Sequence, residues 1–342
     1  MGCCNCWNKY CGGEAFKQQR LPAQSPHCSA SCILASFFVS GFMCIGIGIA
    51  TLLSSRAAYS QTLDYTDCLQ VSTNQRCHDI LASKPPCEVC VCEMDFVVDQ
   101  NLTGDVYFFY GLRNFYQNAR LYMQSYPVYQ MHRDLDSPVD DCDVGNLAKA
   151  SNGKTIVPCG AMADSLFNDT FTIFRGSSAD GAQLPLIYQG MISKYWNDIK
   201  FENPKNMNDF KNYPHPPSWC KRADQLDPYN ADNNGFKNFD FQVWMTPAAL
   251  PTFMKPWRKL DRSSNYYKNG LTAGTYTLRI DYKYPAIKVT DKYRTKKIFT
   301  ILTTTWLGGR NDFLGIAYLV TGCLLALSGL TLLLVHWKYG TR

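Results

Sequence analysis

One stretch of the chain, Ala148–Thr155 (AKASNGKT), satisfies a relaxed phosphate-loop pattern and could in principle bind nucleotide phosphates. A working loop of that kind follows a buried strand and opens a helix, whose N-terminal amides hold the phosphates. Here the acidic run Asp140–Asp143 precedes the match, and Pro158 soon follows it. We therefore expect a polar turn between two cysteines and no nucleotide site.

A second stretch, Asn230–Gly235 (NADNNG), resembles the first half of a calcium-binding loop. Such a loop needs a bidentate Glu at its twelfth position, and that position is Phe241. The pattern favours an Asx-rich turn that leads into a strand.

The run Cys87–Cys92 (CEVCVC) allows three kinds of chemistry: disulfide formation, zinc binding and redox catalysis. Zinc needs reduced thiolates, and the nearest histidine, His78, has no partner at ligand spacing. Disulfides are favoured, because the long segment from Arg56 to Asp312, which lies between two apolar runs described below, holds an even number of cysteines. These are Cys68, Cys77, Cys87, Cys90, Cys92, Cys142, Cys159 and Cys220.

Cys142 and Cys159 stand apart from the other six and enclose a short loop, so we predict that they pair. Spacing alone leaves the remaining connections open.

Catalytic patterns are missing from this long central segment. Its histidines, His78, His132 and His215, fit no catalytic arrangement, and we find no nucleophile elbow, metalloprotease helix or paired-carboxylate motif. We expect a protein that is not an enzyme and that needs no metal or cofactor, with an enzyme of unfamiliar type as an open alternative.

The N-terminal cysteines could carry lipid. Cys3, Cys4 and Cys6 follow Gly2, but position six is not Ser or Thr, so the myristoylation motif is incomplete. Palmitoylation of these thiols, free reduced thiols and, less favoured, zinc binding all stay open.

Two uncharged apolar runs flank the long segment that contains these motifs and must position it. The first lies within Cys28–Ser55 and the second is Phe313–Val335, and each is long enough to cross the roughly 30 Å hydrocarbon layer as a helix. The first lacks the short apolar core of a signal peptide and follows about 30 polar residues, so we predict a retained anchor. Ser40, Cys44 and Gly48 in the first run, and Gly322 and Ala326 in the second, predict close helix packing.

The flanking charges and the sequons set the orientation. Lys9, Lys17 and Arg20 precede the first run, and Lys338 and Arg342 follow the second, which favours cytoplasmic tails. Asn101 and Asn168 open N-glycosylation acceptors, which fit a lumenal or extracellular middle segment. We predict a cytoplasmic tail (1–30), a span (31–54), an ectodomain (55–312), a span (313–335) and a cytoplasmic tail (336–342).

The ectodomain should consist mainly of antiparallel strands. Tyr276–Tyr284 alternates apolar and polar residues, and Ile298–Thr305 and Thr170–Phe174 are further strands. Short helices are expected at Ala161–Phe167 and at Asn114–Met123, the latter capped by Asn114. Residues 203–238, rich in Asn, Asp and Pro, should form loops. The fold class is thus a β-sandwich-like, disulfide-bonded and glycosylated ectodomain between two transmembrane helices.

The composition excludes some classes of protein. The chain has 342 residues, 16 cysteines and a formal net charge of +6, but the excess charge is spread over the tails and the long middle segment. No basic domain results, so nucleic acid is not an expected partner.

Five blocks, in chain order, resemble motifs of the cell division control protein 50 (ligand-effect modulator) family. They are Phe16–Ala23 (FKQQRLPA), Tyr110–Asn118 (YGLRNFYQN), Pro158–Thr170 (PCGA and FNDT), Asp232–Phe253 (DNNGF, VWM and AALPTF) and Trp306–Tyr318 (WLGGRN and FLGIAY). The match runs from about Phe16 to Lys338. The sequence departs from the family's motifs at Ala119–Leu121, Thr246–Pro247 and Asp164. These departures bear on particular contacts to a partner and not on the resemblance to the family as a whole.

The family's members are accessory, or beta, subunits of type IV P-type ATPases, the phospholipid flippases. The resemblance implies a non-catalytic subunit of such a heterodimer in secretory-pathway membranes, required for folding, export and activity of its partner. It also implies that Cys90 and Cys92 bridge back to upstream cysteines in nested fashion. The implied partner-binding residues are Phe16, Gln18, Gln19, Leu21, Pro22, Tyr110, Asn114, Phe115, Tyr116, Gln117, Asn118, Trp244, Met245, Leu250, Pro251, Phe253, Gly308, Gly309 and Asn311.

A trimeric two-span ligand-gated channel is the main alternative, because such channels share the topology and the disulfide-rich ectodomain. The second apolar run offers few polar groups to line a pore, namely Thr321, Ser328 and Thr331. This disfavours the channel.

Overall fold

The computed structural model describes residues 30–82, 87–137, 142, 144–193, 199–285 and 294–340. The chain divides into two compact units, one formed by its two ends (1–54 and 311–342) and one by Ser55–Arg310. The predictions for Cys3, Cys4, Cys6 and the Phe16–Pro22 motif fall outside the described residues.

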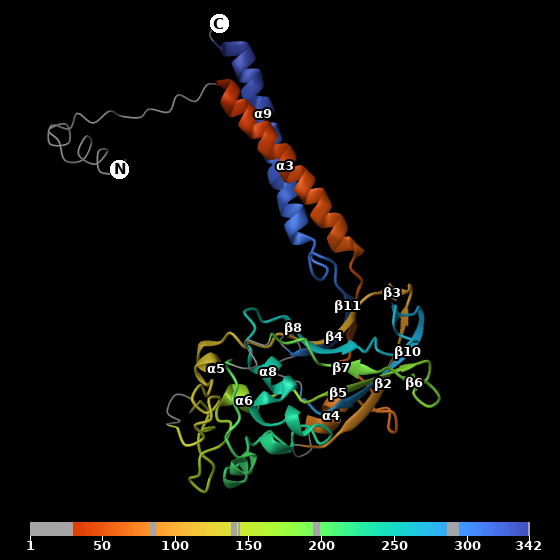
Figure 1. Ribbon diagram of the computed structural model, residues 1–342, viewed down its shortest axis with the longest axis vertical. Coiled ribbons are helices and arrows are strands. Elements are labelled where there is room, and N and C mark those ends of the chain that lie inside the picture. The colour runs from red at the N-terminus through yellow and green to blue at the C-terminus, as the bar shows by residue number, and fades with distance from the viewer. Residues whose placement is uncertain are drawn as a thin grey trace, which may run out of the picture. The chain divides into compact units, whose positions relative to one another are not determined.

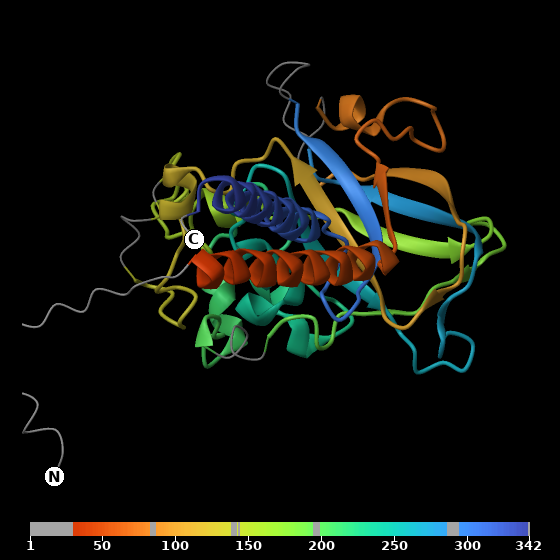
Figure 2. The same cartoon turned by 90° about the horizontal axis from the view of Figure 1, so that it is seen from above.

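Two long apolar helices form the first unit, α3 (Ala30–Ala57) and α9 (Phe313–Tyr339). Both are long and apolar enough to cross a membrane, and each extends beyond the span predicted from the sequence. They pack side by side (Figure 1, Figure 2). Glycines seven residues apart on each helix make this contact: a Cβ on Gly322 would lie 2.7 Å from Ile45 Cγ1, and one on Gly48 would lie 3.1 Å from the Gly315 carbonyl oxygen.

The second unit is built on antiparallel sheets, as predicted. A five-stranded sheet has the order β1-β11-β4-β8-β7, a four-stranded sheet has the order β2-β10-β5-β6, and β3 pairs with β9 (Figure 1). The strands are β1 (Ser60–Asp64), β2 (Cys90–Val98), β3 (Leu102–Thr103), β4 (Val106–Arg113), β5 (Thr170–Arg175), β6 (Ala182–Gln183), β7 (Leu186–Ile187), β8 (Phe253–Leu260), β9 (Gly270–Leu271), β10 (Gly274–Tyr282) and β11 (Lys296–Thr303).

The core lies between the two larger sheets. On β10 the alternation predicts the buried face correctly, since Tyr276, Leu278, Ile280 and Tyr282 are all buried. Phe171 on β5 meets Phe299 on β11, with ring centroids 4.8 Å apart, so the two sheets are joined by aromatic packing. This confirms the sandwich-like architecture.

Short helices lie outside the sheets. The α-helices are α4 (Cys77–Ala82), α5 (Arg120–Gln124), α6 (Ala161–Asp164) and α8 (Phe239–Met245), and the 3-10 helices are η2 (Met207–Asn212), η3 (Ala223–Gln225), η4 (Ala231–Asn233) and η5 (Gly235–Lys237).

Several predicted elements differ from the structure in their bounds. The helix predicted at Ala161–Phe167 ends at Asp164, and the strand predicted at Tyr276–Tyr284 is Gly274–Tyr282. The loops predicted at residues 203–238 include the short 3-10 helices η2 to η5.

Three further predictions also differ from the structure. The helix predicted from Asn114 begins only at Arg120; Asn114 has a positive φ of 60°, and the N-cap residue of this helix is Ala119. The strand predicted at Ile298–Thr305 lies two residues earlier at both ends, at Lys296–Thr303. The Asx-rich turn at residues 230–235 leads toward α8 and not into a strand, because the Asn238 side chain caps that helix by accepting from the Phe241 amide.

Four disulfides join parts of the second unit: Cys68–Cys92, Cys77–Cys90, Cys87–Cys220 and Cys142–Cys159. The first two are nested, as the family resemblance implies, and the fourth is the pair that spacing predicts. The stretch that mimics a phosphate loop is a turn between Cys142 and Cys159, closed by a bridge between Lys149 and Thr155.

Candidate partner-binding surface

Residues 114–118 and 246–254, which overlap two of the family-like blocks, lie against each other in the second unit. The Phe115 amide donates to the Pro251 carbonyl (3.1 Å), and the Asn118 side-chain amide donates to the Ala249 carbonyl (3.0 Å). The Gln117 side chain accepts from the Ala248 amide (3.0 Å). These bonds fix residues 115–118 against a segment about 130 residues away, and Asn114 before them has a positive φ that a right-handed helix does not contain.

Six of the residues implied as partner-binding are buried in this arrangement: Tyr110, Phe115, Gln117, Trp244, Met245 and Phe253. Phe115 packs edge-on against the Trp244 ring at 5.6 Å, and the Trp244 indole donates to the Met162 carbonyl at 2.8 Å. Because the side chains of these six residues lie in the core, they support the segments packed over them and do not themselves form a contact surface for a partner.

Lys255 is a further support that sequence reasoning missed. Its side chain is 5% exposed, and Nζ donates to the Val243, Trp244 and Thr246 carbonyls at 2.9, 2.7 and 2.6 Å. It thereby satisfies carbonyl groups left over at the C-terminus of α8. Burial lowers the pKa of Lys255 to about 7. Its position in the sequence is the available signal: Lys255 lies two residues from Phe253 and two from Trp257, so all three side chains share the inward face of β8.

The side chains that do reach the surface belong to the same two segments. Tyr116 is 57% exposed, Leu250 67% and Met254 48%, and Asn114 and Asn118 beside them are exposed as well. We call these five residues the motif surface. These residues come from two segments that hydrogen bonds hold against each other, and apolar side chains exposed on such a supported backbone are typical of protein interaction sites. Met254 was absent from the sequence prediction.

The block at residues 305–311 forms a separate feature. Thr305 and Gly308 exchange two backbone hydrogen bonds of 2.9 and 3.0 Å, which closes a tight turn. Gly308 has a φ of 109°, a conformation that favours glycine, and the turn leaves Trp306 78% exposed. Asn311 accepts from the Phe313 amide with its side chain (3.0 Å) at the start of α9.

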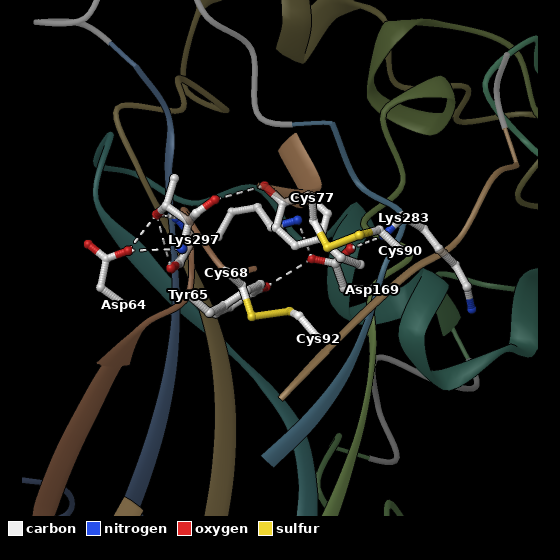
Figure 3. The surroundings of a disulfide bond; sticks show 11 residues. Asp64, Tyr65, Cys68, Cys77, Cys90, Cys92, Asp169, Lys283 and Lys297 are labelled. Atoms are coloured by element: carbon white, nitrogen blue, oxygen red, sulfur yellow. Dashed lines mark hydrogen bonds and ion pairs between the residues drawn. A yellow bond between two sulfur atoms is a disulfide. The ribbon is translucent and has the colours of Figure 1, made fainter. Parts of the chain in front are cut away.

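A buried polar network lies deeper in the unit, next to the nested disulfides (Figure 3). Asp169 is 3% exposed; Oδ1 accepts from the backbone amides of Lys283 and Tyr284 (both 2.7 Å), and Oδ2 accepts from the Tyr65 hydroxyl (3.0 Å) and pairs with the Lys297 ammonium. Burial lowers the pKa of Lys297, and the Asp169 carboxylate opposes that fall. Asp169 thus ties together the segments that contain β1, β5, β10 and β11.

The two sequons differ in surroundings. Asn101 is exposed, and its side-chain oxygen accepts from the Ala273 amide at 2.8 Å. Asn168 is half-buried, and its side-chain oxygen is buried without a hydrogen-bond partner among the described residues.

Comparison with known proteins agrees with the resemblance in the motifs. The model of the LEM3 (ligand-effect modulator 3) family / CDC50 family matches residues 51–342. The chain is 38% identical to Cell cycle control protein 50A of Bos taurus over 335 residues, covering 95% of this chain and 88% of that protein. It is 37% identical to Cell cycle control protein 50B of Homo sapiens over 340 residues (95% and 93%).

A plant protein, Putative ALA-interacting subunit 4 of Arabidopsis thaliana, is 33% identical over 314 residues, covering 90% of this chain and 84% of that protein. With its two apolar terminal helices, its antiparallel sheets and its four disulfides, the chain is therefore a membrane protein that belongs to the LEM3/CDC50 family.

Proposed function

We propose that this chain is the non-catalytic accessory (beta) subunit of a type IV P-type ATPase that translocates phospholipids. The observation that carries the proposal is the match to the LEM3/CDC50 family over residues 51–342, together with a relative whose name describes an ALA-interacting subunit. In this role the chain is needed for folding of the ATPase, for its export from the endoplasmic reticulum and for its activity.

The proposed topology places both termini in the cytoplasm and residues 55–312 in the lumen or outside the cell. Four disulfides support this orientation, because such bonds persist in oxidising compartments. The complex would reside in membranes of the secretory pathway, with Asn101 and Asn168 glycosylated.

A subunit of this kind acts through binding energy. If it binds the folded ATPase and not the unfolded chain, it stabilises the folded form by mass action. If it also binds some transport intermediates more tightly than others, it shifts their populations. The motif surface is the part of the second unit that we assign to this contact.

Affinity purification of the tagged chain in mild detergent, followed by mass spectrometry, tests the proposal. We expect a roughly equimolar type IV P-type ATPase. Recovery of the chain alone as a stable trimer would instead support the channel hypothesis, which ionic current in a reconstituted bilayer would then test.

Single substitutions test the assigned surface. Tyr116→Asp and Leu250→Asp place a charge at exposed positions, so both variants should fold and be exported but recover at least about tenfold less ATPase, a loss of about 1.4 kcal/mol or more. Tyr229→Asp is the matched control, because Tyr229 is 98% exposed and lies outside the motif surface. Equal ATPase recovery with all three variants would remove the motif surface from the interface.

A further inference from the structure

A cleft of about 420 Å³ opens beside the second sequon, within the unit Ser55–Arg310. Its volume falls within the range of about 300–1,000 Å³ that is usual for sites that hold small ligands. Trp219 and Trp257 line it, both less than 10% exposed, and the Cys87–Cys220 disulfide and Val89 complete part of its wall. Aromatic faces with a few polar groups are typical of a pocket that holds a small amphipathic molecule.

Asn168 itself lines this cleft. Its side-chain oxygen is buried without a hydrogen-bond partner among the residues that the structure describes. A buried, unpaired acceptor costs about 1–3 kcal/mol, so the site lacks a donor that some occupant would supply. Asn101 is unlike it: that side chain is exposed, and its oxygen already accepts from the Ala273 amide.

The burial of the residue after Asn168 determines whether the sugar is attached before or after folding. Asp169 is 3% exposed and is bound by Tyr65, Lys283, Tyr284 and Lys297. In the folded chain the middle residue of the sequon is therefore fixed in the core, so the sequon cannot enter the active site of a transferase. A sugar on Asn168 must be attached before these contacts close, and the fold must then leave room for it.

We propose that this cleft holds the innermost N-acetylglucosamine of a glycan carried by Asn168. In the attachment step the Asn168 amide nitrogen forms a bond to C1 of the sugar of a lipid pyrophosphate-linked oligosaccharide. The bond from C1 to the pyrophosphate oxygen breaks, the lipid pyrophosphate leaves with the electron pair, and the amide loses one proton to a base.

The chemistry of this sugar matches the lining of the cleft. The apolar face of its ring can lie against the indoles of Trp219 and Trp257, and its acetamide N–H and hydroxyl groups are donors. Acceptors that line the cleft include the Asn168 side-chain oxygen and the Asp240 carboxylate, which also accepts from Arg258. The glycan on Asn101, which has no such cleft, should project into solvent.

The inference rests on the proposed lumenal position of this unit and not on any ATPase partner. It is tested on the full chain, purified in mild detergent from its own cells and treated with peptide N-glycosidase, which cleaves the bond between asparagine and sugar. Mass spectrometry follows conversion of each Asn to Asp. We expect release at Asn168 to be at least tenfold slower than at Asn101 in the folded protein, and equally fast after reduction and denaturation.

Equal rates at the two sites in the folded protein would overturn the proposal, because the Asn168 sugar would then be accessible. A glycan on Asn101 with none on Asn168 would also overturn it while leaving the topology intact. The absence of both glycans would reject the lumenal position and the proposal together.

A variant in the wall provides a second test. Val89 is 43% exposed, so Val89→Ala should fold normally, and by opening the cleft it should speed release at Asn168 several-fold without changing Asn101. An unchanged rate at Asn168 would contradict the placement of the sugar. Thr103→Ala, which removes only the Asn101 sequon, is the matched control and should leave the Asn168 rate as it is.

Discussion

Replacing Asp169 by asparagine removes the charge at the centre of the buried network and little else. Asparagine has nearly the same shape, and its side-chain oxygen can still accept from the backbone amides of Lys283 and Tyr284. The sequon that begins at Asn168 survives, because its middle position accepts any residue except proline, so the glycan should not be lost with the charge. The variant therefore isolates the ion pair with Lys297.

The expected loss follows from the burial of both partners. The side chains of Asp169 and Lys297 are fully buried, so Asp169→Asn leaves an ammonium without its counter-charge in the core. Removing one member of such a pair costs about 3–5 kcal/mol, a large part of the roughly 5–15 kcal/mol that keeps a domain folded. Tyr65 also loses a charged acceptor for its hydroxyl.

The assay is denaturant unfolding of the purified chain in detergent, followed by tryptophan fluorescence, for Asp169→Asn, Lys297→Met and the double variant. The double variant should be more stable than the sum of the single losses predicts, by about 1–3 kcal/mol, because it leaves no unpaired charge. Lys296→Met is the control: that neighbouring side chain is 55% exposed, so its loss should change stability by less than about 1 kcal/mol.

Two results would refute this reasoning. One is an Asp169→Asn variant whose free energy of unfolding lies within about 1 kcal/mol of the native protein, well below the loss expected for a buried pair. The other is strict additivity in the double variant, which would mean that the two side chains do not stabilise each other.

Three further outcomes are expected. Burial lowers the pKa of Lys255 to about 7, so the folded chain loses this proton at a lower pH than the unfolded chain does, and the free energy of unfolding rises between about pH 7 and about pH 10. In Lys255→Met the free energy of unfolding should rise less steeply over this range, by up to about 1.4 kcal/mol per pH unit, and equal slopes in the two proteins would contradict the assignment. Gly322→Ala places a Cβ within 2.8 Å of the backbone of the other helix, so it should lower the stability measured by thermal unfolding by about 1–3 kcal/mol. Gly46→Ala, whose Cβ would have nothing within 4 Å, should change that stability little, and the reverse order would reject the helix contact. Replacing Cys142 or Cys159 by Ser breaks a disulfide with a sequence separation of 17, which should lower the folding stability by about 3 kcal/mol. Both variants should therefore be retained early in the secretory pathway, and maturation of their glycans would argue against a structural bridge.

The elements that the sequence predicts best have a local physical cause. An uncharged apolar run of more than about 20 residues has one stable form in a lipid bilayer, the helix, so the long helices could be predicted from composition alone. Strict alternation on Tyr276–Tyr282 matches the two faces of a half-buried strand, and the structure buries those residues as expected. The pair Cys142–Cys159 could be predicted because the two residues are close in the chain.

Elements that depend on distant contacts were harder to predict. Residues 114–123 have the apolar spacing of a helix, yet the first part of this stretch is held by hydrogen bonds to residues 248–251. The Cys87–Cys220 disulfide has a sequence separation of 133, and no spacing pattern indicates it. Such contacts form only when the sheets bring separate segments together.

The candidate partner surface shows the same division. The sequence by itself determined the family, the two apolar helices and the blocks of residues that matter. Only the tertiary structure decided that Phe115 and Trp244 are buried supports while Tyr116 and Leu250 are exposed, and that the polar Asp169 and Lys255 lie in the core. The physical reason is that periodicity and composition are local properties of a chain, whereas the burial of one side chain depends on which distant segments pack over it.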